Sequence, residues 1–305
     1  MSLHKNPRRA ALVINTHSRK AERTFFMVLD KLEAAGVIVT DLFPVRNPDH
    51  LSKAVEKAIA QGNQLIIIGG GDGTISAMSG HFVNRDVTLG ILPLGTANSF
   101  IKSLGIPTGI DAAISVLAQG KEERIDVGSI NGTYFANALS YGYTTLVAYN
   151  TSTRMKRVLG IAAYALEGFI QALRARPFTI DVTCDGVATR LTTYQAIVAN
   201  GTFYGPTTLA RSATLNSGKL VLLTMQNMHR RTLLHAWITT LFGKSLASQT
   251  TLTITGKEIE ITPKPAQAIT VDGEILHANT LILKIHPEAI KVLVPANFQK
   301  KKRAS

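Results

Sequence analysis

The chain has 305 residues, of which 45% are hydrophobic and 17% are charged. This balance supplies enough apolar material for two globular domains and too little charge for a disordered chain. The single cysteine, Cys184, excludes an intrachain disulfide and alternates with Ile180 and Val182, so a core position is expected for it. No apolar run is long enough for a membrane span and the start does not read as a signal peptide, so we expect a soluble or peripheral cytoplasmic protein.

The net charge is +13, and the basic residues gather in short clusters. Such a surplus suits nucleotide phosphates, anionic lipid headgroups or nucleic acid, and it also suits a merely solvated surface. Charge alone does not choose among these partners. The clusters are "KNPRR" (5–9), "RMKR" (154–157), "RAR" (174–176) and "KKKR" (300–303).

The first part of the chain alternates between two periodicities. Short apolar runs at 10–15, 37–43, 65–68 and 87–93 predict buried strands. Amphipathic stretches between them, such as 22–36 and 49–62, each end in a glycine that suits a helix C-cap. Strands that alternate with helices predict a parallel sheet covered on both faces.

After about residue 125 the pattern changes to hairpins. Apolar alternation flanks Asn131-Gly132 and Asp185-Gly186, which are strong signals for two-residue turns between antiparallel strands. Further strand patterns follow up to "KVLV", with helical insertions near 155–174 and 229–242. The second domain is therefore predicted to be mostly antiparallel β structure.

The stretch "LIIIGGGDGTISAM" (65–78) turns from a strand into a helix through glycines. In an open parallel sheet, ligands collect at the carboxyl ends of the strands. Glycines there let backbone N–H groups approach phosphate oxygens, and Thr74 is expected to cap a helix whose N-terminus favours anions. A carboxylate repels phosphate unless a cation lies between them, so Asp72 predicts a bridging Mg²⁺.

The next predicted strand repeats this arrangement in "LGILPLGTANSF" (89–100), with Gly95, Thr96 and Asn98 in the turn. Turns on successive strands of one sheet would form two walls of one phosphate pocket. Neither turn matches the dinucleotide fingerprint G-x-G-x-x-G, and the chain has no G-x-x-x-x-G-K-[ST] loop. A Rossmann dehydrogenase and a P-loop NTPase are both disfavoured.

Five segments in fixed order and spacing form one pattern along the chain. They are "GGDGT" (70–74), "LPLGTAN" (92–98), "IDVG" (125–128), "NGTFYG" (200–205) and "VDGE" (271–274). Together they resemble the bacterial diacylglycerol kinase-like lipid kinases, over nearly the whole chain. The resemblance implies an α/β nucleotide-binding domain, a β-sandwich domain, ATP and Mg²⁺ as cofactors, and transfer of the γ-phosphoryl group to a lipid hydroxyl. It places the ATP-binding domain at residues 1–127, joined by the segment 287–305, and the sandwich with the general base and lipid site at 128–286.

The resemblance also implies roles for individual residues. Glu274 matches the proposed general base, which a transfer to an alcohol requires. Asp126 and Lys156 match residues near the cleft, and Lys156 suits phosphate binding. Asp72 would hold the ATP-bound Mg²⁺, and Thr40, at the carboxyl end of the second strand, matches a nucleotide contact. The remaining ATP-phosphate positions are Gly70, Gly71, Gly73, Thr74, Thr96 and Asn98.

Some of these positions have plainer readings, and some depart from the family pattern. "VDGE" is also an ordinary hairpin turn, and Lys156 could be one more solvated base. Ser99 stands where many members have Asp, and Lys102 where an Arg is usual. Ser217 replaces a carboxylate, which puts the structural Mg²⁺ of the second domain in doubt. The histidines show no zinc-site spacing.

Two other functions stay open beside the lipid kinase. NAD kinases share "GGDGT" but usually carry a different second turn, and a catalytically idle nucleotide- or lipid-binding protein is suggested by Ser99 and Ser217. For partners we expect a lipid substrate and transient docking on the anionic inner face of the membrane, and no nucleic acid. The oligomeric state is left open, with a homodimer among the options. The stripe Val158, Ile161, Ala165, Phe169 and Leu173 lies between basic ends and would either pack on the sandwich or enter a membrane.

Overall fold

The computed structural model describes residues 7–16, 19–95, 98–151, 161–204, 207–209, 213–225, 231, 233–235, 238 and 251–299. The chain forms two compact units. The first unit takes in the chain up to Val127 and the segment that begins at Pro287, and the second runs from Gly128 to His286. Thr96, Lys156, Val158 and the basic cluster 300–303 lie outside the described residues.

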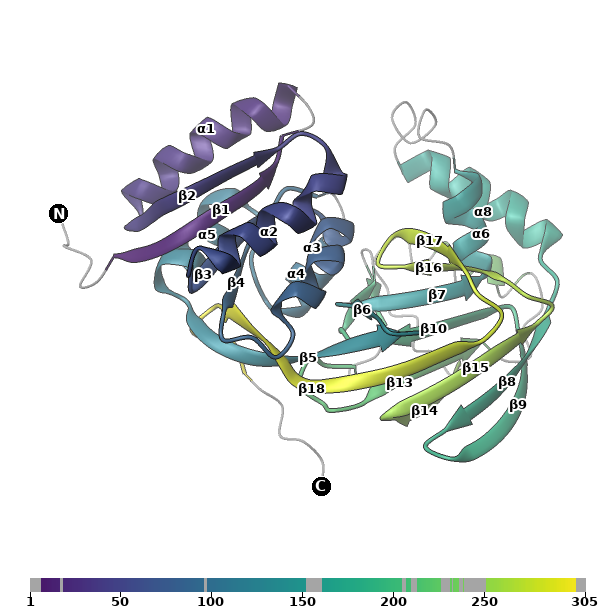
Figure 1. The fold of residues 1–305 in the computed structure, drawn as a ribbon. Helices are drawn as coiled ribbons and strands as arrows, with labels where there is room; N and C mark the ends of the chain where they lie inside the picture. Colours follow the sequence, from purple (N-terminus) through teal and green to yellow (C-terminus); the bar gives the residue numbers. More distant parts are fainter. Residues whose placement is uncertain are drawn as a thin grey trace. The chain divides into compact units, whose positions relative to one another are not determined.

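The first unit contains a parallel sheet in the order β2-β1-β3-β4, with the end of β18 beside β4 (Figure 1). Central strands buried on both faces read as continuous aliphatic runs, which explains the sequence "LIII" at 65–68. The parallel arrangement predicted from the alternating pattern is confirmed. The strands are β1 (Arg8–Asn15), β2 (Val37–Val45), β3 (Leu65–Gly70), β4 (Thr88–Pro93) and β18 (Leu281–Val294).

Helices cover both faces of this sheet. On one face, α1 and α5 pack their apolar residues on Leu12, Ile14 and Ile67. Val13 and Ile68 point to the other face and are fully buried there, where α2 and α3 contact β1 and β3. The helical elements are α1 (Arg19–Ala34), η1 (Pro48–His50), α2 (Leu51–Ala60), α3 (Asp72–Ser79), η2 (Gly80–Phe82), α4 (Ser99–Ser103) and α5 (Ile110–Gln119).

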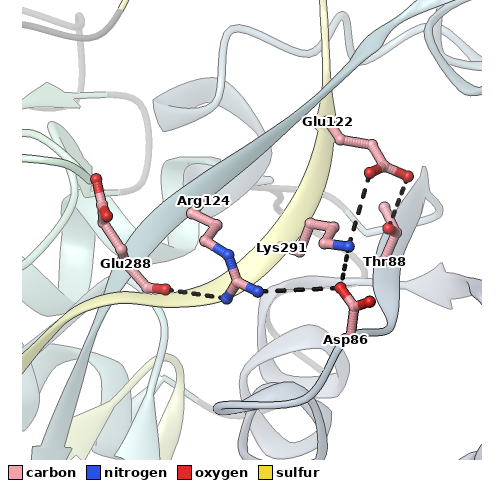
Figure 2. A network of polar contacts seen from close by, with 6 residues as sticks. All are labelled: Asp86, Thr88, Glu122, Arg124, Glu288 and Lys291. Carbon is pink, nitrogen blue, oxygen red and sulfur yellow. Dashed lines mark hydrogen bonds and ion pairs between the residues drawn. The ribbon is translucent and has the colours of Figure 1, made fainter.

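A polar network joins the C-terminal part of β18 to the rest of the first unit (Figure 2). The Lys291 ammonium group contacts the Asp86 carboxylate and lies 3.8 Å from a Glu122 oxygen. Thr88 donates its hydroxyl to Glu122 at 2.9 Å. The hydrogen bond from Lys291 lowers the pKa of Asp86. Since the Asp86 side chain is 84% exposed, water and salt screen its ion pairs strongly.

The second unit is a β-sandwich. One sheet has the antiparallel order β14-β13-β10-β7-β16-β17, and the facing strands run β18-β15-β8-β9. Their inner faces share one apolar core that includes Tyr141, Phe178 and Ile261, and also Cys184 as expected. The further strands are β5 (Lys121–Ile130), β6 (Thr133–Phe135), β7 (Ala138–Gly142), β8 (Phe178–Cys184), β9 (Val187–Thr193), β10 (Gln195–Ala199), β11 (Phe203–Tyr204), β12 (Thr207–Thr208), β13 (Leu220–Met225), β14 (Thr251–Gly256), β15 (Glu258–Lys264), β16 (Ala268–Val271) and β17 (Glu274–His277).

The predicted two-residue turns are present in this unit. Asn131-Gly132 joins β5 to β6, and Asp185-Gly186 joins β8 to β9, with positive φ at all four residues. Such turns match the twist of the strands that they connect. The mixed α/β and antiparallel β architecture predicted from the sequence is therefore confirmed.

Two helices, α6 (Tyr143–Asn150) and α8 (Ile161–Arg174), pack against each other in the second unit (Figure 1). Their inward side chains, Tyr143, Val147 and Ala172, form a small core with Met225 and Leu233. The α8 helix accounts for most of the helical insertion predicted near 155–174. Among the described residues, no helix is long and apolar enough to cross a membrane.

Candidate functional site

The turns that follow β3 and β4 touch each other through glycines. A Cβ atom on Gly95 would lie 2.5 Å from the Gly71 Cα atom, and a Cβ atom on Gly71 would lie 3.1 Å from the Gly95 Cα atom. The Leu94 N–H donates to the Gly70 carbonyl at 3.0 Å. The glycines are therefore needed for contact between the turns, whatever they also do for a ligand.

The α3 helix begins with a free end. Its N-cap residue is Gly71, and no side chain caps it. Thr74 is the third residue of the helix and not its cap, so that expectation was wrong. Its side chain lies over Gly70, where an added Cβ atom would come within 2.6 Å of it. The N–H groups of Asp72, Gly73 and Thr74 have no acceptor within the helix, which is the usual arrangement for binding an anion.

Asp72 links the first turn to the helix after the second turn. One oxygen of its carboxylate accepts the Ser99 N–H at 2.9 Å, and the other accepts the Phe100 N–H at 3.0 Å. These are the first two residues of α4. The Asp72 carboxylate therefore caps the N-terminus of α4, although Asp72 is not part of that helix. This contact was missed from the sequence. It explains why a carboxylate is kept within the glycine turn.

Asn98 holds the second turn in an unusual conformation. Its φ angle is 51°, and its side-chain amide donates to the Gly95 carbonyl at 3.0 Å. The residue is 4% exposed, and its Oδ1 atom has no hydrogen-bond partner among the described residues. A buried acceptor without a donor is costly. A ligand that brings an N–H or O–H group would satisfy it.

Thr40 lies away from these turns. It is in the middle of β2 and not at its carboxyl end, which corrects the prediction. Its hydroxyl is 3.2 Å from the Asn63 Oδ1 atom, and Asn63 precedes β3 whereas Gly70 ends that strand. Asn63 and Gly70 are seven residues apart along the chain. Thr40 therefore lies near the amino end of β3, whereas the glycine turn follows its carboxyl end. The structure thus does not bring Thr40 to the glycine turns.

Asp126 is fully buried on β5. One of its oxygens accepts the N–H of Glu288 at 2.9 Å, and Glu288 has a φ angle of 53°. The carboxylate thereby stabilises a left-handed backbone position within β18. This contact holds Asp126 against β18.

Glu274 begins β17 and is exposed. It follows the turn residues Asp272 and Gly273, whose φ angles are 45° and 100°. Val271 pairs with Glu274 across this turn, so the plainer reading of "VDGE" as a tight hairpin is correct. The hairpin does not test the predicted catalytic role of Glu274, which stays a prediction.

The carboxylate of Asp272 anchors this hairpin. It is 8% exposed and accepts the N–H groups of Ala136 at 2.8 Å, Asn137 at 3.1 Å and Ala138 at 2.8 Å. Asn200, the first residue of "NGTFYG", donates its side-chain amide to the Ala136 carbonyl at 2.8 Å. Segments far apart in the sequence therefore meet at one buried polar cluster, two residues before Glu274.

The described residues hold no ready-made cluster of cation ligands. No three His, Cys, Asp or Glu side chains among them gather as a metal site would require. The Ser217 hydroxyl instead donates to the Lys219 carbonyl at 2.9 Å and forms a local turn. At Asp72, the two N–H bonds leave further lone pairs on both oxygens, so the carboxylate fits a cation that also binds phosphate.

Two family models match this chain. The diacylglycerol kinase catalytic domain covers residues 9–130, and the YegS C-terminal NAD kinase beta sandwich-like domain covers residues 137–294. The chain is 27% identical to a diacylglycerol kinase of Staphylococcus saprophyticus, over 96% of this chain and 97% of the relative. It is 28% identical to a diacylglycerol kinase of Bacillus subtilis, over 88% and 90% respectively.

One solved structure agrees in fold, and a further relative matches in sequence. A crystal structure from Bacillus anthracis, described as that of a "putative diacylglycerol kinase", has a TM-score of 0.80 at 21% identity and covers 97% of this chain and 99% of that one. An uncharacterised Synechocystis protein is 29% identical over 80% of this chain, which spans 58% of its length. The chain therefore belongs to the family of lipid kinases that combine a diacylglycerol kinase catalytic domain with a YegS C-terminal NAD kinase beta sandwich-like domain.

Proposed function

We propose that this lipid kinase uses ATP and Mg²⁺ to phosphorylate the hydroxyl group of a diacylglycerol-like lipid. The observation that carries the proposal is the contact between Gly71 and Gly95, beside the uncapped start of α3. This places two turns and three N–H groups without helical acceptors at one edge of a parallel sheet. Phosphoryl transfer needs positioning and charge stabilisation more than covalent chemistry, and such a site supplies both.

In this proposal the nucleotide binds to the first unit. The N–H groups of Asp72, Gly73 and Thr74 bind phosphate oxygens, and the Asn98 Oδ1 atom accepts a hydrogen bond from the nucleotide. Mg²⁺ would neutralise charge on the transferred phosphoryl group, with Asp72 as its protein ligand. Because Asp72 also binds α4, its carboxylate keeps one fixed orientation while it does so.

Glu274 of the second unit is proposed as the proton acceptor for the lipid hydroxyl. An exposed carboxylate on a hairpin is free to contact a substrate, and Asp272 fixes the backbone two residues before it. A base held on a rigid element suits general base catalysis. Asp126 and Lys156 are proposed to support the same chemistry through the family resemblance alone.

We propose that the kinase works at the inner face of the membrane as a peripheral protein. The lipid acceptor resides in a bilayer, and the net charge of +13 favours an anionic leaflet. NAD kinase is the second candidate function, because residues 137–294 match an NAD kinase-like sandwich.

One assay separates the two candidates. The protein is incubated with Mg²⁺ and ATP labelled in its γ-phosphate, together with either diacylglycerol in detergent micelles or NAD. We expect label in the lipid fraction, and none in NADP. Label in NADP alone would replace the lipid kinase by the second candidate, and label in neither product would refute both.

A further inference from the structure

The α8 helix buries two polar side chains among small apolar ones and exposes its large apolar side chains. Glu167 and Gln171 are each 8% exposed and point into the second unit, where the Gln171 amide donates to the Glu167 carboxylate at 2.7 Å. Leu166, Phe169 and Leu173 are 49%, 47% and 56% exposed. A helix that only packs on its own domain has its apolar residues inside. The stripe through Ala165, Phe169 and Leu173 therefore does not pack on the sandwich.

The neighbouring helix extends this surface. The Tyr143 hydroxyl of α6 donates to the Gly168 carbonyl of α8 at 2.5 Å, which holds the two helices together. On its outer side α6 exposes Leu146 by 37% and Tyr149 by 62%. We call Leu146, Tyr149, Leu166, Phe169 and Leu173 the α6–α8 apolar face. Five large exposed apolar side chains on two packed helices are a candidate interaction surface.

The exposed charges on these two helices, and directly after α8, have one sign. Glu167 is the only acidic residue of α6 and α8, and it is turned inward. Arg174 ends α8, and both Arg174 and Arg176 are exposed. An apolar face with cations at the end of α8 is complementary to acyl chains below anionic headgroups.

We propose that the α6–α8 apolar face docks on an anionic lipid bilayer, with its large side chains at the headgroup boundary. The inference rests on the proposed function, because a lipid kinase must reach an acceptor that stays in the bilayer. Docking buries Leu166, Phe169 and Leu173 away from water, and the arginines at the end of α8 contact lipid phosphates. Aromatic residues such as Tyr149 and Phe169 suit the polar–apolar boundary of a membrane.

The test measures cosedimentation with vesicles in the absence of ATP. The double variant Leu166→Glu/Phe169→Glu places two charges on the face, at positions that are half exposed and should tolerate them. Val187→Glu is the matched control, because Val187 is a 69% exposed apolar residue on β9. On vesicles of phosphatidylcholine and phosphatidylglycerol, we expect the double variant to bind about tenfold or more weakly than wild type. The control should bind like wild type, and all three proteins should have similar Tm values.

A second variant tests the charge component. Arg174→Glu/Arg176→Glu should weaken binding to anionic vesicles and leave the weaker binding to pure phosphatidylcholine unchanged. Vesicle binding by the face variant equal to that of wild type would overturn the proposal, and so would an absence of wild-type binding to either vesicle. Phosphorylation of detergent-dispersed diacylglycerol should persist in the face variant. Vesicle binding by a wild-type protein that phosphorylates no lipid would leave the docking face standing and refute the proposed function instead.

Discussion

Two aspartates in glycine-rich turns, one in each unit, use their carboxylates in related ways but in different surroundings. Asp72 accepts two backbone N–H groups of α4 and is partly exposed. Asp272 accepts three backbone N–H groups between β6 and β7 and is 8% exposed. Each carboxylate connects its turn to a segment distant in sequence.

Exposure separates a carboxylate that can also bind a ligand from one that only stabilises the fold. Asp72 keeps lone pairs that a cation could reach, beside the free start of α3. The Asp272 carboxylate is enclosed, and the exposed carboxylate of its hairpin is Glu274, two residues later. Substitutions at these carboxylates, and at one exposed carboxylate elsewhere, test this division.

Glu274→Gln should have the largest effect. Loss of the proton acceptor is expected to lower kcat by a factor of about 10² to 10⁴, while the Tm and ATP affinity stay close to wild type. Steady-state kinetics with dispersed diacylglycerol, and ATP titration by calorimetry, measure the two parameters. If ATP affinity falls and kcat does not, Glu274 contributes to nucleotide binding and is not the base.

Asp272→Asn should mainly affect stability. The amide group of Asn has one oxygen instead of two and turns an N–H donor toward the buried N–H groups of Ala136 and Ala138. We expect a loss of about 3 kcal/mol in the free energy of unfolding, measured by urea denaturation. A variant as stable as wild type would show that the cluster does not hold the hairpin.

Asp72→Asn should lower turnover more than stability. The loss of a charged ligand for the proposed Mg²⁺ is expected to reduce kcat/KM about 10- to 100-fold. The Asn oxygen still accepts one of the two α4 N–H groups, so the free energy of unfolding should fall by only about 1 kcal/mol. The same denaturation and kinetic measurements serve here. Full activity in this variant would remove Asp72 from the site.

Asp86→Asn should have the smallest effect. Its carboxylate contacts Lys291 and Arg124 but is almost fully exposed (Figure 2). Because Lys291 lowers the pKa of Asp86, the ion pair stabilises the protein above the ordinary pKa of the carboxyl group and is lost as the pH falls through the lowered value. At neutral pH the Tm should stay near that of wild type. A clear decrease in Tm that is the same at low and high salt would assign this network a larger structural role.

The architecture followed from local patterns in the sequence. Aliphatic runs that alternate with amphipathic stretches indicated the parallel sheet, and Asn-Gly or Asp-Gly pairs indicated the hairpins, because both signals lie within a few residues. The apolar stripe of α8 was also visible in the sequence, but the sequence did not show whether the stripe points toward the sandwich or toward solvent. Burial of Glu167 depends on Gln171 and on the surface that α8 meets, and periodicity does not report which face points inward.

The candidate site was predictable only in part. The glycines and Asp72 were singled out by their position after a strand, yet the partners of Asp72 are 27 and 28 residues away. Asp272 was read as a turn residue, since a long-range bond to Ala136 leaves no trace in spacing. Thr40 was misplaced because the resemblance suggested its role but not its position along the strand. That position is set by the pairing of β2 with β1.

ATP binding by Gly95→Ala tests whether the two touching turns form the phosphate site. The added Cβ atom would lie 2.5 Å from the Gly71 Cα atom, so the turns must separate. We expect calorimetry with Mg²⁺ to show ATP binding to wild type and Glu274→Gln, and binding to folded Gly95→Ala that is about tenfold or more weaker. ATP affinity in Gly95→Ala equal to that of wild type would show that contact between the two turns is not needed for the phosphate site.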